Sequence, residues 1–308
     1  MSKNYGKHYS VMYKECLDAL TLNDSSSEIF ADMTFGAGGH TFGLANSSDK
    51  AQVYSTDQDP DAIKNGNERI KENSLEGKVH LIKTNYTDFP QWVEQNKPEL
   101  KFQGILMDLG VSSHQFDTFD RGFSFREDAP LDMRMDYEND EIETAADILN
   151  NYDEEDIANL IFKYGEERLS RRIAAEIVSR RAENPISRTK ELEDICFHAY
   201  PKKMRFGKTH PATRTFQALR IAVNAELEVL ENTIQKLFDI LDVGGTLVII
   251  SFHSLEDRIV KHKFKEIFQT DKNIAKILTK KPLLPSEEEI SENKRSRSAK
   301  LRVIQKIS

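Results

Sequence analysis

Short apolar runs alternate with amphipathic stretches along the first 110 residues of the chain. The apolar runs have the length and the flanking turn residues of buried strands, whereas the stretches between them repeat apolar positions with helical spacing. Strands are predicted at 28–33, 52–57, 79–83 and 102–109, and helices at 8–28, 39–45, 60–72 and 88–96. This alternation is typical of a parallel, doubly wound α/β sheet.

The alternation stops near residue 110 and returns near residue 244. A loop rich in Asp, Arg and Phe is predicted at 110–136, followed by helices at 145–149, 154–164, 166–181 and 189–199. The remaining elements are a helix at 215–241, a strand at 244–253, a helix at 254–268 and a last strand at 300–307. A block of helices within an α/β alternation predicts an inserted helical subdomain at 137–210, with residues 1–136 and 211–308 forming the sheet domain.

The first predicted strand leads into a glycine-rich turn that contains Gly36, Gly38 and Gly39. Glycines allow positive φ and a close approach of the backbone to a ligand, although an ordinary βα turn uses them too. A dinucleotide fingerprint beginning at Gly36 would need a glycine at the position of Thr41, and no phosphate-binding P-loop follows a strand. The turn therefore favours the glycine loop of a methyltransferase that uses S-adenosylmethionine (SAM).

Acidic residues stand at the ends of three predicted strands: Asp32, Asp57 and Asp108. Ligands of open α/β sheets lie outside the carboxyl ends of the strands. Asp57 is placed to accept the ribose hydroxyls of a nucleoside, and Tyr86, beyond the third strand, to contact an adenine. A single acid at such a place more often forms a cap or a turn, but the joint placement of acids at three strand ends favours a site.

Composition narrows the class of protein. The chain has 308 residues, two cysteines and a formal net charge of -8. Cys16 and Cys196 lie too far apart in sequence for a metal-type spacing, so no metal site is predicted. No apolar stretch has the length of a membrane span or of a signal segment, so a cytoplasmic protein is expected.

Seven motifs together resemble one known family. They are DMTFGAGGH at 32–40, DQDP at 57–60, DLGVSS at 108–113, RGFSF at 121–125, LDMRMD at 131–136, HPATRTFQA at 210–218 and SFHSLEDR at 251–258. The chain resembles the bacterial 16S ribosomal RNA (cytosine-N4) methyltransferase family over nearly its whole length. The resemblance implies a Rossmann-like SAM methyltransferase sheet with an inserted all-helical subdomain for substrate recognition.

The resemblance also implies the cofactor, the partner and the site. The cofactor would be SAM, and the substrate N4 of a decoding-region cytosine in the 16S rRNA of the small ribosomal subunit. By position, the residues that contact SAM would be Gly38, Gly39, His40, Asp57, Tyr86, Asp108 and Gln115. The oligomeric state does not follow from the resemblance.

Methylation of N4 needs a group that accepts a proton, because the lone pair of this nitrogen is delocalised into the ring. Asp108 is the first candidate for this catalytic role, and Ser112, Ser113 and His253 are the others. His253 also fits a buried histidine with purely structural contacts.

Basic residues concentrate in and after the predicted insert, and the stretch 202–214 contains no acidic residue. Such a stretch favours contact with phosphates, although charged runs usually form a solvated face. Phe119, Phe123 and Phe125 would either stack on a splayed base or anchor their loop to the core. Two further functions remain open: a SAM methyltransferase for DNA or protein, and a non-catalytic RNA-binding module.

Overall fold

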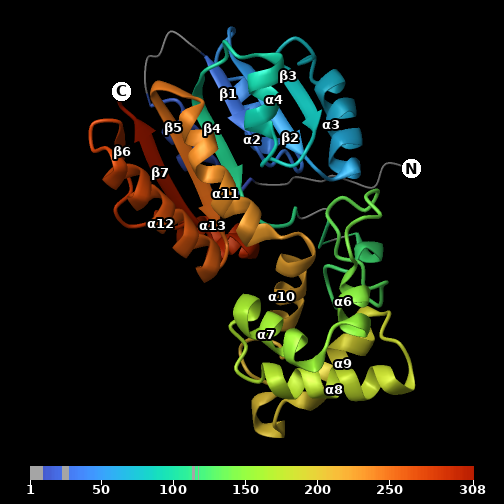
Figure 1. The fold of residues 1–308 in the computed structure, drawn as a ribbon. Coiled ribbons are helices and arrows are strands. Elements are labelled where there is room, and N and C mark those ends of the chain that lie inside the picture. The colour runs from blue at the N-terminus through green and yellow to red at the C-terminus, as the bar shows by residue number, and fades with distance from the viewer. Residues whose placement is uncertain (1–9, 23–27, 113–114, 117) are drawn as a thin grey trace. The chain divides into compact units, whose positions relative to one another are not determined.

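The computed structural model describes residues 10–22, 28–112, 115–116 and 118–308. The chain forms two compact units, each considered by itself (Figure 1). The first consists of Met1–Gly110 and Leu227–Ser308, and the second of Val111–Glu226. The predicted insert, 137–210, therefore lies wholly within the longer second unit. Within the described ranges, every helix falls short of the length and apolarity that a membrane crossing requires.

The first unit contains a sheet of seven strands among the described residues, in the order β3-β2-β1-β4-β5-β7-β6. Its strands are β1 (Ile29–Asp32), β2 (Gln52–Asp57), β3 (Val79–Lys83), β4 (Phe102–Asp108), β5 (Leu241–Ser251), β6 (Ala275–Ile277) and β7 (Lys300–Lys306). Strands β3, β2, β1, β4 and β5 pair in parallel, which confirms the predicted α/β class. Chain order reverses between β1 and β4, and the carboxyl ends of two such strands are where open α/β sheets usually bind their ligands.

Alternating side chains of the strands supply the two apolar layers of this unit. Ile105 and Met107 face one layer, whereas Leu106 between them faces the other. Helices α4 (Phe89–Asn96), α11 (Glu226–Asp239) and α12 (Ser254–Thr270) cover the first layer. Helices α1 (Tyr13–Leu20), α2 (Gly39–Ala45) and α3 (Pro60–Glu72) cover the second. Because successive side chains of a strand point to opposite faces, each strand contributes apolar residues to both layers.

The C-terminal edge of the sheet differs from the prediction in two ways. Strand β7 runs antiparallel to both β5 and β6, so the sheet is mixed. Strand β6 was not predicted, because three residues are too few to show a period. The charged segment before β7 forms α13 (Glu287–Glu292) and the 3-10 helix η3 (Lys294–Ser298). Of the predicted helix 8–28, the structure describes α1 alone, and residues 8–9 and 23–27 lie outside the described ranges.

The second unit is mostly helical. It contains η1 (Phe119–Arg121), α6 (Ala145–Asn151), α7 (Glu154–Gly165), α8 (Ser170–Glu183), α9 (Thr189–Ala199), η2 (Lys202–Met204) and α10 (Thr213–Val223). Its own apolar core joins these helices and includes Ile161, Ile173, Leu192 and Phe216. Two of the family-like motifs also belong to this core, because Phe123, Leu131 and Met133 are buried in it.

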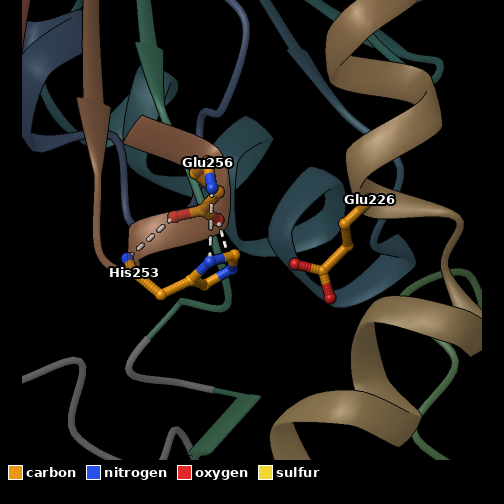
Figure 2. A group of neighbouring side chains, drawn as sticks. All are labelled: Glu226, His253 and Glu256. Atoms are coloured by element: carbon orange, nitrogen blue, oxygen red, sulfur yellow. Dashed lines mark hydrogen bonds and ion pairs between the residues drawn. The ribbon is translucent and has the colours of Figure 1, made fainter. Parts of the chain in front are cut away.

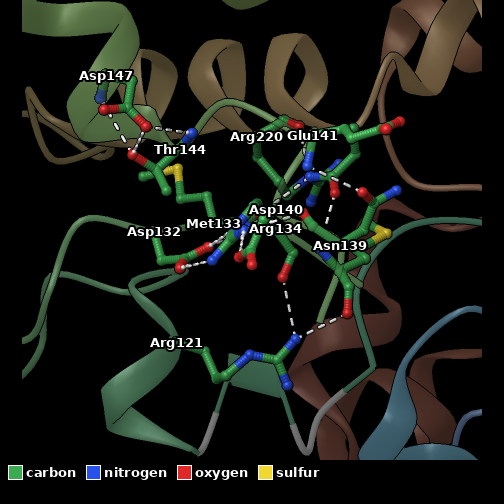
Figure 3. A network of polar contacts seen from close by, with 12 residues as sticks. Arg121, Asp132, Met133, Arg134, Asn139, Asp140, Glu141, Thr144, Asp147 and Arg220 are labelled. Atoms are coloured by element: carbon green, nitrogen blue, oxygen red, sulfur yellow. Dashed lines mark hydrogen bonds and ion pairs between the residues drawn. The ribbon is translucent and has the colours of Figure 1, made fainter. Parts of the chain in front are cut away.

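A network of polar contacts fixes the loop that carries these two motifs (Figure 3). The buried Arg121 donates from Nη2 to the carbonyl oxygens of Arg134 and Met135, at 3.0 and 2.9 Å. Arg134 in turn pairs with Asp132, with 2.9 Å between Nε and Oδ1. The charged side chains of Arg121, Asp132 and Arg134 therefore stabilise the conformation of this loop.

The predicted single helix at 215–241 is wrong. It breaks into α10 and α11 at Asn224 and Ala225, and Ala225 has a φ of 47°. The side chain of Asn224 leaves the helical pattern to accept the N–H of Met135 at 2.8 Å and to donate to the carbonyl of Met133 at 2.8 Å. These long-range contacts outweigh the continuous apolar period of the segment.

Candidate active site

The glycine turn after β1 is held open by backbone conformation and by distant side chains. Gly36 and Gly38 have positive φ values of 51° and 78°, and a residue with a side chain would be strained at either position. The N–H of Phe35 donates to the carbonyl of Thr56 at 2.9 Å, which ties the turn to the end of β2. The guanidinium of Arg69, on α3, donates to the carbonyl of Ala37. These contacts fix the turn to the end of β2 and to α3.

Asp32 stabilises this turn through hydrogen bonds to both of its carboxylate oxygens. Its Oδ1 accepts the N–H of Thr34 at 3.1 Å, and its Oδ2 accepts the hydroxyl of Thr41 at 2.7 Å. The residue is buried, and burial raises its pKa to about 6. Both oxygens are thus engaged within the fold, so Asp32 stabilises the turn.

Asp57, at the end of β2, accepts two backbone N–H groups. Its Oδ2 lies 2.8 Å from the nitrogen of Gly36 and its Oδ1 lies 2.9 Å from that of Asp59. Each carboxylate oxygen has a second lone pair, so the group keeps room for two hydroxyl donors. Burial raises its pKa to about 7, and the carboxylates of Asp59 and Asp32 add to this rise.

Asp108 and His40 form a pair beside the turn. Nε2 of His40 lies 3.6 Å from Oδ2 of Asp108, and the Tyr13 ring stacks on the imidazole at 5.9 Å between centroids. Burial disfavours the imidazolium, but Asp108 and Asp32 outweigh it and raise the pKa of His40. The N–H of Asp108 donates to the hydroxyl of Thr34 at 2.8 Å. The other carboxylate oxygen, Oδ1, is buried and has no hydrogen bond with a described residue.

Tyr86 lies just beyond β3, half-buried against the apolar layer of α4. The loops that follow β2 and β3 are tied together, because Asn85 donates to the side chain of Gln58 at 2.9 Å. The N–H of Thr84 also donates to the carbonyl of Asp57, at 3.0 Å. All six of the predicted contacts in the first unit lie at its strand ends, in the loops next to them or at the start of α2: Gly38, Gly39, His40, Asp57, Tyr86 and Asp108.

Gln115 and Ser112 belong to the second unit. The amide oxygen of Gln115 accepts the N–H of Ser112 at 2.9 Å, and the hydroxyl of Ser112 accepts the N–H of Gln115 at 3.3 Å. This reciprocal pattern is that of a capping box. Ser113 lies outside the described residues.

His253 forms the N-cap of α12 (Figure 2). Its Nδ1 accepts the N–H of Glu256 at 3.3 Å, while the Glu256 carboxylate accepts the N–H groups of Phe252 and His253 at 2.7 and 3.2 Å. Nε2 of His253 lies 3.2 Å from Oε1 of Glu256. Glu226, also drawn in Figure 2, pairs with Arg220 inside the second unit. These contacts give His253 a structural role, and a catalytic one stays a prediction.

The aromatic residues of the loop separate into two groups. Phe123 is buried, and Phe125 packs on His210 and Phe216 with centroids 4.8 and 5.0 Å apart. These two rings anchor the loop to the core, which was one of the two predicted roles. The side chain of Phe119 lies outside the described residues.

Two residues that matter to the turn were not predicted. Thr34 links Asp32 to Asp108, and its place two residues after an aspartate is the pattern of an Asx turn, which the sequence does show. Arg69 reaches the turn from 32 positions away along the chain. No local pattern marks such a contact.

The chain is similar in sequence to known proteins over nearly its whole length. The sequence pattern of the MraW methylase family matches residues 5–307. "Ribosomal RNA small subunit methyltransferase H" of Nostoc punctiforme (strain ATCC 29133 / PCC 73102) is 46% identical over 300 residues, which cover 97% of this chain and 94% of that protein. The protein of the same name from Clostridioides difficile (strain 630) is 45% identical over 314 residues, with 97% and 99% covered.

Proposed function

We propose, from the premise that this chain belongs to the MraW methylase family, that it transfers a methyl group from SAM to N4 of a decoding-region cytosine in 16S rRNA. The full-length relatives are named as methyltransferases of small-subunit ribosomal RNA. The observation that carries the proposal is the group of residues around the glycine turn. A ribosomal substrate would place the reaction in the bacterial cytoplasm.

The residues at the strand ends fit SAM. When bound, this cofactor supplies an electrophilic methyl group on a cationic sulfonium. Asp57 offers the two free lone pairs that adjacent ribose hydroxyls require, and positive φ at Gly36 and Gly38 keeps side chains out of the turn. Asp108 offers a buried carboxylate oxygen with no hydrogen bond to a described residue. Carboxylates near a sulfonium also lower its energy.

Asp108 is the residue that we assign to the chemical step. A carboxylate that accepts the N4–H of the cytosine would localise the nitrogen lone pair, stabilise the positive charge that develops on N4, and take up the proton that N4 loses. The backbone of Asp108 is fixed by Thr34, and its Oδ2 is oriented by His40. Ser112 and Ser113 remain the second candidates, since a serine hydroxyl also accepts a hydrogen bond.

The proposal is tested with the full-length protein, SAM and purified small-subunit particles that lack the modification. Calorimetry should show binding of SAM, and mass mapping of the rRNA after incubation should show one added methyl group on one cytosine. A methyl group on another base, or on a ribosomal protein, would reject the proposed substrate. SAM binding without any transfer would favour a non-catalytic module.

A further inference from the structure

The loop between α9 and α10 is the most basic acid-free segment of the second unit (Figure 1). Arg205 fixes its backbone: Nε donates to the carbonyl of Tyr200 at 3.0 Å, and Nη2 to that of His198 at 3.2 Å. The same guanidinium lies over the ring of Phe197, 5.1 Å from its centroid. Arg205 therefore holds the loop, and its guanidinium donates hydrogen bonds to two carbonyl oxygens within the fold.

Phe206 projects from this fixed loop into solvent. Its side chain is 87% exposed. It meets the ring of Phe197 almost at right angles, 75° between planes and 5.8 Å between centroids, so the two rings do not stack face to face. Burial of such a ring would stabilise the fold by roughly 1.5–3 kcal/mol, and the exposed ring of Phe206 does not make this contribution. Single exposed apolar residues are common, so the surroundings of Phe206 decide what it means.

Three lysines flank Phe206 along the sequence of the loop. Lys202, Lys203 and Lys208 are exposed, and none of them forms an ion pair with a described residue. No acidic residue occurs between 202 and 214. An exposed aromatic face among unpaired positive charges is complementary to a polyanion that also offers flat bases. An apolar protein segment would contact only the aromatic ring, and an acidic segment would contact only the lysines.

We propose that Phe206 stacks on an unpaired base of the RNA substrate while Lys202, Lys203 and Lys208 contact the adjacent phosphates. This inference rests on the proposed function, because it names how the rRNA is held. A duplex hides the faces of its bases, so the surface selects a single-stranded segment. Phe123 and Phe125 cannot supply this stack, because they pack into the core.

The test measures binding of a labelled single-stranded RNA of about 12 nucleotides by fluorescence anisotropy, beside a duplex of the same length. Phe206→Ala should weaken single-strand binding by about 5- to 150-fold, the range of one lost base–aromatic stack. Phe206→Trp should retain the affinity, and its indole fluorescence should be quenched by the RNA. The matched control is Phe162→Ala on α7, since this ring is 60% exposed in the same unit but lies on a helix outside the basic loop.

The control and the duplex affinities should each change by no more than about twofold, as for ordinary surface substitutions. Equal losses for Phe206→Ala and Phe162→Ala, or an equal loss on the duplex, would overturn the stack. If the wild-type protein methylates small-subunit RNA and Phe206→Ala still binds the single strand normally, this inference fails and the proposed function stands. If the wild-type protein does not bind the single strand, this inference fails, and methyl transfer to small-subunit particles alone decides the proposed function.

Discussion

Asp57 is the residue through which we expect cofactor binding to depend on pH. Its folded-state pKa is raised by burial from 3.8 to about 7. Without cofactor, the protonated form favours the fold, so this contribution to stability is complete below about pH 4 and is lost as pH rises through about 7. Ribose hydroxyls would donate to the carboxylate and thus favour its ionised form.

We therefore predict that SAM binding releases protons near pH 7 and becomes tighter as pH rises through this value. Calorimetry in two buffers that differ in ionisation enthalpy measures the release. Asp57→Asn should remove most of the release and weaken binding by roughly 1.5–3 kcal/mol, as expected for hydrogen bonds to a charged group. Wild-type binding that shows no proton release between pH 6 and about 8 would contradict the assignment.

Asp108 allows a second prediction at this scale. Asp108→Asn keeps the shape of the side chain but removes the negative charge that accepts N4–H. Single-turnover methyl transfer at saturating SAM should fall by about 10²- to 10⁴-fold, the usual scale for a positioned acid–base group. Recovery of the wild-type rate at saturating SAM would instead make Asp108 a residue for cofactor binding alone.

At the scale of elements, the turn after η1 depends on Gly122. Its φ is 75°, and a Cβ there would clash with the carbonyl oxygen of Pro130. We predict that Gly122→Ala destabilises the second unit by about 1–3 kcal/mol through strain and overpacking. Thermal unfolding followed by circular dichroism measures the change. Gly77→Ala is the control, because its Cβ would meet nothing within 4 Å, and a similar loss in both variants would refute the steric account.

At the scale of the whole molecule, a net charge of -8 coexists with the basic loop at 202–208. Nucleic-acid affinity must then come from a local set of charges, because the average field repels a polyanion. Among the basic residues of the loop, Arg205 is engaged by carbonyl oxygens, which leaves the three lysines for phosphates.

Replacing Lys202, Lys203 and Lys208 by Gln should weaken RNA binding and lower its log–log salt slope by roughly 2, at about 0.7 for each lost phosphate contact. Affinity for SAM should stay the same. The control replaces Lys50, Lys64 and Lys71, three exposed lysines of the first unit, and matches the change in net charge. Equal slopes for the two triple variants would show that the loop does not contact phosphates.

The sequence alone determined the class of fold and most of the strands. An apolar period of two or 3.6 is a local property, and burial imposes it on each strand and helix separately. The acids at the ends of β1, β2 and β4 followed from the same reasoning, since parallel strands bring their carboxyl ends to one edge. For Phe123 and Phe125, by contrast, the sequence allowed two roles equally, stacking on a base or anchoring the loop. Only their packing distinguishes between these roles.

Only the tertiary structure decided the features that depend on residues far apart in the chain. Asn224 breaks a continuous helical pattern because Met133 and Met135 lie beside it. Arg69 secures the glycine turn from another helix, and β7 enters the sheet antiparallel. Phe206 is exposed because Arg205 fixes the loop on carbonyls and on Phe197. The contacts of Asn224, Arg69 and β7 join distant segments, whereas Arg205 contacts residues at most eight positions away. No period of apolar residues encodes contacts of either kind.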